Sequence, residues 1–176
     1  SARARLRLQT TFTRLLADSA GRLVRREVQD ITRMLDAVDD GDVDAFLARM
    51  DAWQEKLPSA VRSIMGPMLA AYIEDVAEEA SDEVEAEWDE ISPRVDAWTE
   101  SYIDTLSRGH TTETVGRITG TMTEAEGDPF ANARGMLSRW DENRANEMGL
   151  REAVTAAGGA SVLVYGMMGR NAVWRT

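Results

Sequence analysis

The hydrophobic residues near the start of the chain recur at steps of mostly three and four, which predicts one long amphipathic helix over about 5–39. Asp39-Asp40-Gly41 is expected to end it. At about 1.5 Å per residue such a helix is roughly 50 Å long, more than one small domain is expected to cover. We therefore expect it to project or to pair with another chain. The candidate interface residues on its apolar stripe are Leu8, Phe12, Leu15, Leu23 and Ile31.

Similar stripes and helix-start signals predict five or six further helices. Asp42 is expected to cap the second helix, which ends before Pro58, and Gly66-Pro67 should kink or restart the third. The remaining helices are expected to begin at Ser92-Pro93, Thr111, Asp128-Pro129 and around Arg144, with ends or breaks at Gly109, Gly135 and Gly158-Gly159.

The periodicity changes after Gly159. The stretches SVLVYG (161–166) and NAVWRT (171–176) are short, rich in β-branched and aromatic residues, and predict two strands. The expected fold is mainly α: a helical bundle with a long N-terminal helix, followed by a small α+β end. We divide it into a long helix and helical hairpin over 1–57 and a helical core over 58–176 that enters a β element and is cut off at 176.

Charge and composition exclude several classes of functional site. The chain has 176 residues, no cysteine, one histidine and a net charge of −11, so thiolate metal sites and cysteine nucleophiles are excluded within it. Residues 1–27 carry seven Arg against two acids, whereas 28–100 carry 20 acids against five basic residues. DNA contact is therefore expected only indirectly or through the basic N-terminal helix. No apolar run reaches the roughly 18 residues of a membrane span.

Candidate chemistry is sparse. The carboxylates over 74–90 include pairs three and four residues apart that could chelate a divalent cation, but a solvated helix face explains them better. His110 follows Gly109 at an expected helix end, which favours a loop or capping role. No nucleophile or phosphate-loop motif accompanies it. We expect neither an enzyme nor a cofactor.

Three short elements near the end resemble the phage Mu F-like head morphogenesis family, the minor capsid proteins. Gly109, Thr111 and Val115 are similar to its G-x-[ST]-x-x-x-[IL] helix start, although Val stands where the family has Ile or Leu. Arg144-Ala145 and Glu152 resemble its R-A-x-x-I-A-R-T-E helix, with Gly149-Leu150-Arg151 in place of Ala-Arg-Thr. Trp174 and Thr176 resemble a W-x-T strand that enters a β-rich end.

The resemblance spans roughly 60–176 and is sharp from about 100 onward. It implies a virion protein at the portal vertex that aids head assembly and DNA packaging or ejection, with the portal or other capsid proteins as partners. It would occupy the capsid interior, and the host cytoplasm during assembly. The structural-motif residues carried over are Arg144, Ala145, Glu152 and Trp174. Because Arg144 and Glu152 are two helical turns apart on roughly one face, they could join a buried ion-pair network, and surface charges are the alternative.

Other functions stay open at this point. The chain could be the C-terminal part of a portal fusion or the leader of a larger toxin. It could also be a helical-bundle adaptor that forms homo-oligomers through residues 5–39. A metal-dependent hydrolase that uses the carboxylates of 74–90 is the third alternative.

Overall fold

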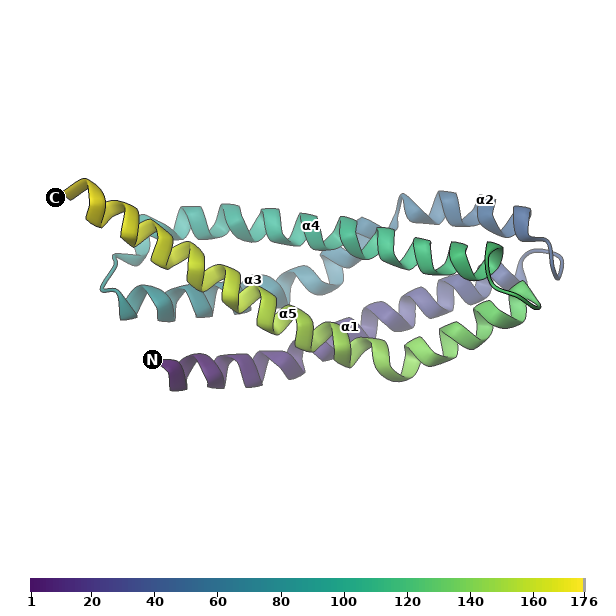
Figure 1. The fold of residues 1–176 in the computed structure, drawn as a ribbon, viewed down its shortest axis with the longest axis horizontal. Coiled ribbons are helices and arrows are strands. Elements are labelled where there is room, and N and C mark those ends of the chain that lie inside the picture. Colours follow the sequence, from purple (N-terminus) through teal and green to yellow (C-terminus); the bar gives the residue numbers. More distant parts are fainter. Residues whose placement is uncertain (176) are drawn as a thin grey trace.

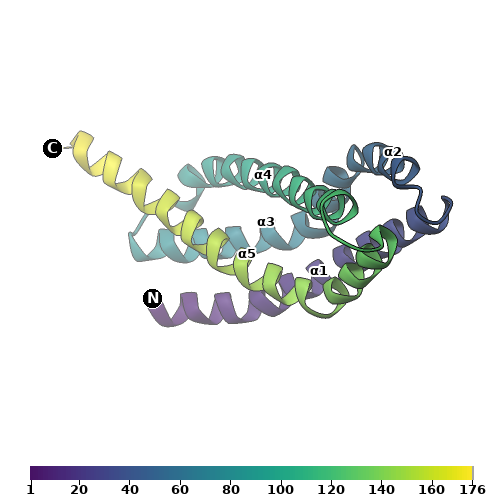
Figure 2. The same cartoon turned by 45° about the vertical axis from the view of Figure 1, so that its right-hand side comes forward.

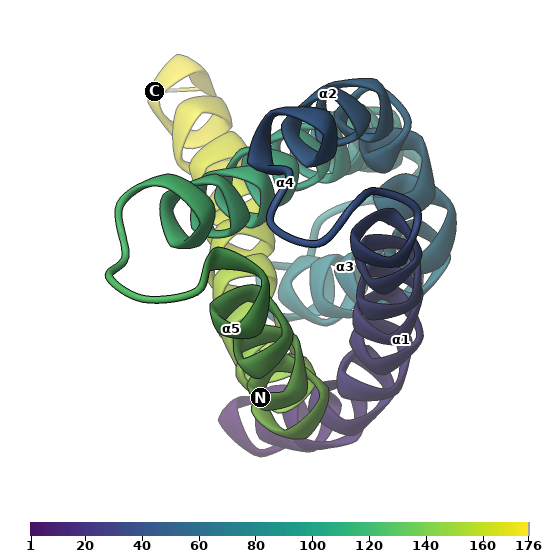
Figure 3. The same cartoon turned by 90° about the vertical axis from the view of Figure 1, so that its right-hand side faces the viewer.

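The computed structural model describes residues 1–175, with side chains described for 1–141 and 143–169. Five helices make up this part of the chain. They are α1 (Ala2–Asp36), α2 (Val43–Gln54), α3 (Leu57–Glu83), α4 (Trp88–Thr123) and α5 (Pro129–Arg175). They form one elongated bundle with both chain ends at the same end (Figure 1). α5 crosses α1 and α3 obliquely (Figure 2), and the end-on view shows α1, α3, α4 and α5 around a common interior (Figure 3).

The mainly α fold is confirmed, but the two expected strands are wrong. Residues 161–166 and 171–175 belong to α5, and Thr176 lies outside the described residues. Buried residues recur along this part of α5 at steps of three and four, namely Ala153, Ala156, Ala160, Val164 and Met167. Packing of this stripe against the bundle overrides the weak β preference of Val and Tyr. The chain therefore has no α+β end within the described residues.

Three of the expected helix breaks are also absent. α4 runs through Gly109, and α5 runs through Gly135 and through Gly158-Gly159. A glycine that ends a helix usually adopts a positive φ. Among the described glycines only Gly41 (φ 83°) and Gly127 (φ 95°) do so, in the loops after α1 and before α5.

Two expected helix starts are confirmed by their capping bonds. The Asp42 carboxylate accepts from the backbone N–H of Ala45 at 3.1 Å and caps α2. Asp128 accepts from the N–H of Phe130 at 3.0 Å, with Pro129 as the first residue of α5. In both cases a short carboxylate satisfies a backbone donor that has no partner within the helix.

Two other local expectations are corrected. Ser92-Pro93 does not start a helix, because α4 already begins at Trp88 and contains Pro93 in its second turn. Pro67 does not restart α3, which continues over Leu57–Glu83 with the proline inside, and a kink at Gly66-Pro67 stays a prediction. Each of these prolines removes one hydrogen bond inside its helix, and tertiary packing retains the helix around both.

The apolar stripe of α1 is covered by the chain itself. Phe12, Leu23 and Ile31 are buried, and Leu8 and Leu15 are partly buried in the same core. Phe12 stacks on Tyr72 of α3, with ring centroids 4.8 Å apart. These side chains therefore form the interior and not the candidate interface that the sequence predicted.

The expectation that α1 needs another chain rested on its length. It is corrected because α3, α4 and α5 contain 27, 36 and 47 residues and can cover a 35-residue helix. α1 contributes to two apolar clusters that it shares with these helices. The division expected between residues 57 and 58 stays a prediction, and α3 begins at Leu57.

Candidate functional site

A cluster of four buried polar residues lies in the interior of the bundle and joins three helices. Its members are Glu27 of α1, His110 and Thr114 of α4, and Arg144 of α5, and we call them the buried polar cluster. His110 and Thr114 are four residues apart, so they share one face of α4. Arg144 is the most exposed member, at 8%. Polar side chains this deep in a core are stable only when they are hydrogen-bonded.

Glu27 is the acceptor at the centre of this cluster. His110 Nε2 lies 2.9 Å from Oε1 and 3.0 Å from Oε2 of Glu27. The Thr114 hydroxyl donates to Glu27 Oε2 at 2.9 Å. Glu27 thus holds α4 against α1 through two side chains.

Arg144 links the cluster to α5. Its Nη2 donates to Thr114 Oγ1 at 2.8 Å, and its Cζ lies 4.1 Å from the ring centroid of Trp140. Burial lowers the pKa of the Arg144 guanidinium, while the negative charges of Glu27 and Glu113 oppose that shift. The result is a chain of contacts from α1 through α4 to α5.

This arrangement does not match a catalytic triad. In a triad the hydroxyl is activated by the histidine, but the Thr114 hydroxyl donates to Glu27 and accepts from Arg144. His110 Nδ1 is buried and has no hydrogen-bond partner among the described residues. With its imidazole buried, the cluster holds helices together and does not present a base to solvent. The expectation that His110 lies in a loop or cap is corrected, because it sits inside α4.

Arg144 and Glu152 are the two charged residues of α5 that match the family's R-A-x-x-I-A-R-T-E helix, and we call the segment that they delimit the family-like helix. Glu152 has a different partner from Arg144. It is 5% exposed, and the Tyr102 hydroxyl of α4 donates to its Oε2 at 2.7 Å. Burial, and then this hydrogen bond, raise the pKa of Tyr102. Arg144 and Glu152 are therefore both buried, as in one of the two expectations. Each contacts α4 separately, and they do not form one joint network.

The resemblance also singled out Ala145, Thr111 and Trp174, and the structure describes the side chains of the first two. Ala145 is partly buried and packs against both apolar clusters. Thr111 is buried, and its hydroxyl donates to the carbonyl of Ser107 at 2.8 Å, within α4. Trp174 falls in the last turn of α5, but its side chain lies outside the described residues.

Tyr72 makes another buried contact between helices. Its hydroxyl donates to the backbone carbonyl of Ala153 of α5 at 2.6 Å. Burial raises the pKa of Tyr72 to about 12. A backbone carbonyl inside a helix is thereby bound to a side chain of α3, which fixes the relative position of α3 and α5.

Two glycines of α5 mark close contacts between helices. A Cβ on Gly149 would lie 2.7 Å from backbone atoms of Ala17 in α1, and a Cβ on Gly159 would lie 2.6 Å from the Trp98 ring of α4. Only glycine fits where a neighbour comes this near. Sequence reasoning interpreted Gly159 as a helix end and gave Gly149 no structural role.

The acidic middle of the chain is a charged surface. Asp75, Glu78 and Asp82 of α3 line an open groove beside α1. Partial burial raises the pKa of the Glu78 carboxyl, and the neighbouring charges of Glu74, Asp75 and Asp82 add to that shift. Within the described residues, no group of three or more potential ligands is placed to hold a metal ion.

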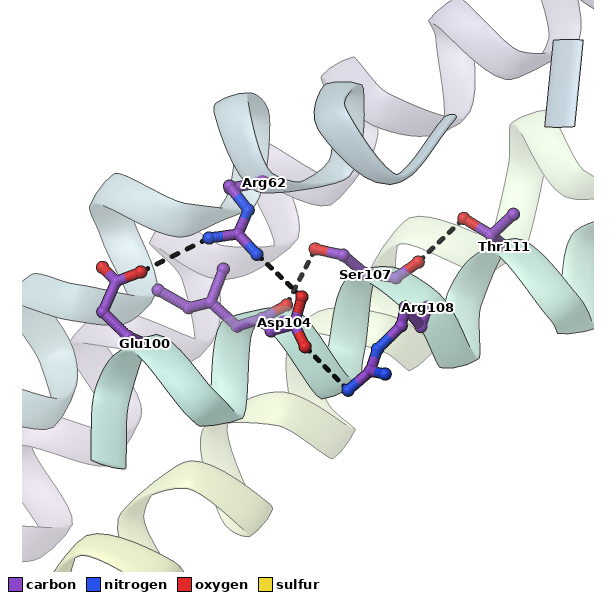
Figure 4. A network of polar contacts seen from close by, with 7 residues as sticks. Arg62, Glu100, Asp104, Ser107, Arg108 and Thr111 are labelled. Atoms are coloured by element: carbon purple, nitrogen blue, oxygen red, sulfur yellow. Dashed lines mark hydrogen bonds and ion pairs between the residues drawn. The ribbon is translucent and has the colours of Figure 1, made fainter. Parts of the chain in front are cut away.

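Ion pairs also join α3 and α4 on the outside of the bundle. Arg62 lies 3.3 Å from Glu100 and 2.9 Å from Asp104, and Arg108 lies 2.7 Å from Asp104 (Figure 4). All four side chains are exposed, so water and salt weaken these pairs to about 0–1 kcal/mol each. They support the packing of α3 on α4 but do not form a site.

Glu27 is the residue of the site that sequence reasoning missed. A signal was present, because Glu27 occupies an inward position of the apolar stripe, three residues after Val24 and four before Ile31. A charged residue at such a position predicts a buried partner. The identity of that partner, His110, was not predictable from spacing.

Comparisons of this chain with protein-family models, with curated proteins and with solved structures found no match. No helix in the described part of the chain combines the length and the apolar character that crossing a membrane requires.

Proposed function

We propose that this protein is a structural component of a larger assembly and, specifically, a minor head protein of a phage that acts at the portal vertex. One observation carries the proposal. Arg144 and Glu152, the two charged residues of the family-like helix, are both buried and each binds a side chain of α4. Buried polar contacts of this kind set the register of packed helices, which is the task of a scaffold.

Fewer of the three segments that resemble the Mu F-like family keep the structure that the resemblance implied. Gly109 and Thr111 lie inside α4 and start no helix, which removes the first element as the resemblance defined it. The residues around them and the helix of Arg144 and Glu152 lie in α4 and α5, which pack on each other. The strand that was to carry Trp174 is replaced by helix. The proposal therefore depends on the α4–α5 pair and not on a β-rich end.

Genes encoding a portal, a terminase and a capsid protein are expected beside the gene for this chain. Co-expression with that portal should give a complex that co-elutes in size-exclusion chromatography and has a light-scattering mass above that of either protein. The capsid protein of an unrelated phage serves as the control. A gene neighbourhood without head genes, or separate elution of the two proteins, would contradict the proposal.

A second candidate function is a self-associating adaptor, favoured by an exposed apolar surface. Residues 153–169 contain no charged side chain, and Val154 and Val162 of α5 are 52% and 71% exposed beside Leu6 of α1, which is 63% exposed. Exposed apolar side chains that gather beside a groove are typical of interfaces. This surface is separate from the α1 stripe that the sequence suggested.

Light scattering across a concentration series tests self-association through this surface. A dimer that becomes monomeric in Val162→Glu, but not in the exposed control Thr112→Glu on α4, is the expected result. A monomer at every concentration excludes this second function and leaves the first one standing.

A further inference from the structure

Arg144 carries hydrogen-bond donors that the described residues do not satisfy. Nη2 donates to Thr114, and the guanidinium lies over the Trp140 ring, but Nη1 is buried without a hydrogen-bond partner among the described residues. A guanidinium has five N–H donors, and a buried donor without an acceptor is unfavourable. The described residues around Arg144 therefore offer no acceptor for Nη1.

The same side chain lines a pocket of about 320 Å³ between α4 and α5. Arg117 of α4 and Arg139 of α5 also line it, together with Asn143. Glu147 is the one carboxylate among the described lining residues, against three arginines. Such a surplus of positive charge is unexpected in a protein with a net charge of −11.

We propose that this pocket binds a phosphoryl group. Guanidinium groups present paired N–H donors that match the oxygens of a phosphate, and the amide of Asn143 adds a further donor. The pocket volume lies at the lower end of the roughly 300–1,000 Å³ typical of small-molecule sites, which leaves room for a phosphoryl group and part of the molecule that carries it. The Trp140 ring holds the Arg144 guanidinium in place, so one of the three cations is already oriented.

The three arginines differ in exposure, and we expect them to contact the phosphoryl group at different stages. Arg144 is tied to Thr114 and Trp140 in the interior, whereas Arg117 and Arg139 are exposed. Arg117 also pairs with Glu113 at 2.9 Å, so its guanidinium is held near the pocket by α4. An incoming phosphoryl group would first meet the exposed arginines and would then supply negative charge beside Arg144. This inference goes beyond the proposed function and does not depend on it.

Isothermal titration calorimetry tests the proposal with two probes, inorganic phosphate and a nucleoside 5′-monophosphate, at an ionic strength held constant with sodium chloride. We expect saturable one-to-one binding of at least one probe. Arg117→Gln and Arg139→Gln should each weaken it at least about fivefold, because each removes a charge-assisted contact. Both residues are exposed, so the variants are expected to fold.

Arg108→Gln is the matched control, because Arg108 is an exposed arginine of α4 that pairs with Asp104 and does not line the pocket. The Arg108→Gln variant should bind each probe with the same affinity as the unmodified protein. Binding of phosphate alone identifies a free anion as the ligand, and equal or tighter binding of the nucleotide identifies a phosphate ester; either result supports the site. Absence of saturable heat with both probes, or affinities unchanged in both pocket variants, overturns it and leaves Nη1 of Arg144 to bound water.

Discussion

His110 of α4 contacts both carboxylate oxygens of Glu27 of α1, at 2.9 and 3.0 Å, although 83 residues separate them in the sequence. The two side chains are 1% and 0% exposed. Thr114 and Arg144 extend this pair to α5, so one polar cluster sets the relative positions of three helices. The stability of the bundle should therefore respond strongly to changes in these few residues.

Glu27→Gln is expected to destabilise the protein by about 3 kcal/mol, because it removes a negative charge that offsets the burial of the Arg144 guanidinium and weakens the bonds to His110 and Thr114. The free energy of unfolding from urea denaturation measures this. Asp18→Asn is the matched control, since Asp18 is an exposed acid on the same helix, and it should change that free energy by at most about 0.5 kcal/mol. Equal effects of the two substitutions would show that the cluster contributes no more than a surface charge.

Gly149→Ala should destabilise the protein by about 1–3 kcal/mol, because the new methyl group would lie 2.7 Å from the backbone of Ala17. Gly158→Ala, on the same helix, has no atom within 4 Å of its added Cβ. It should stabilise the protein by about 0.5–1 kcal/mol through helix propensity. Thermal unfolding followed by circular dichroism distinguishes the two, and a rise in melting temperature for both variants would be evidence against close packing of α1 on α5.

Tyr72 should make the fold sensitive to alkaline pH. Its folded-state pKa, about 12, lies above the ordinary value of 10, so the folded protein binds this proton more tightly than the unfolded chain does. The resulting stability is fully present below pH 10 and is lost as the pH rises from about 10 to about 12. Tyr72→Phe should cost about 1 kcal/mol at pH 7 and reduce this alkaline loss.

Denaturation series at pH 7, 10 and 11.5 measure this dependence. Some loss should remain in Tyr72→Phe, because the pKa of Tyr102 is also raised. Tyr165→Phe is the comparison: Tyr165 is bonded to Glu83 at the surface, and that hydrogen bond raises its pKa, but its screened position should make the effect on the alkaline loss smaller than that of Tyr72→Phe. The prediction fails if Tyr72→Phe and the unmodified protein lose the same stability between pH 10 and 11.5.

Glu152→Gln should lower the pKa of Tyr102, since it replaces a charged acceptor of the Tyr102 hydroxyl with a neutral one. It should also cost about 1–3 kcal/mol in stability, the usual effect of weakening a buried hydrogen bond to a charged group. Absorbance of tyrosinate during a pH titration reports the shift. Glu147→Gln, an exposed acid of the same helix, should leave the titration unchanged.

Particular residues show how far the sequence predicts this fold and site. Steps of three and four in the apolar positions predicted the long first helix and most later helices, and Asp42 and Asp128-Pro129 marked two helix starts. These signals are local, because a cap or a stripe involves residues within a few positions of one another. The resemblance drew attention to Arg144 and Glu152, and the sequence left open whether they are buried or on the surface. Their partners on α4, Thr114 and Tyr102, were not predicted.

The sequence by itself determined the helical class, the acidic charge and the absence of cysteine. Only the tertiary structure decided that Gly109 and Gly159 lie inside helices, that 161–175 is helix, and that the stripe of α1 is covered by this chain. The physical reason is the same in each case. A glycine or a β-branched run has only a weak local preference, and contacts with residues distant in sequence, such as Ala17 with Gly149, decide between the alternatives.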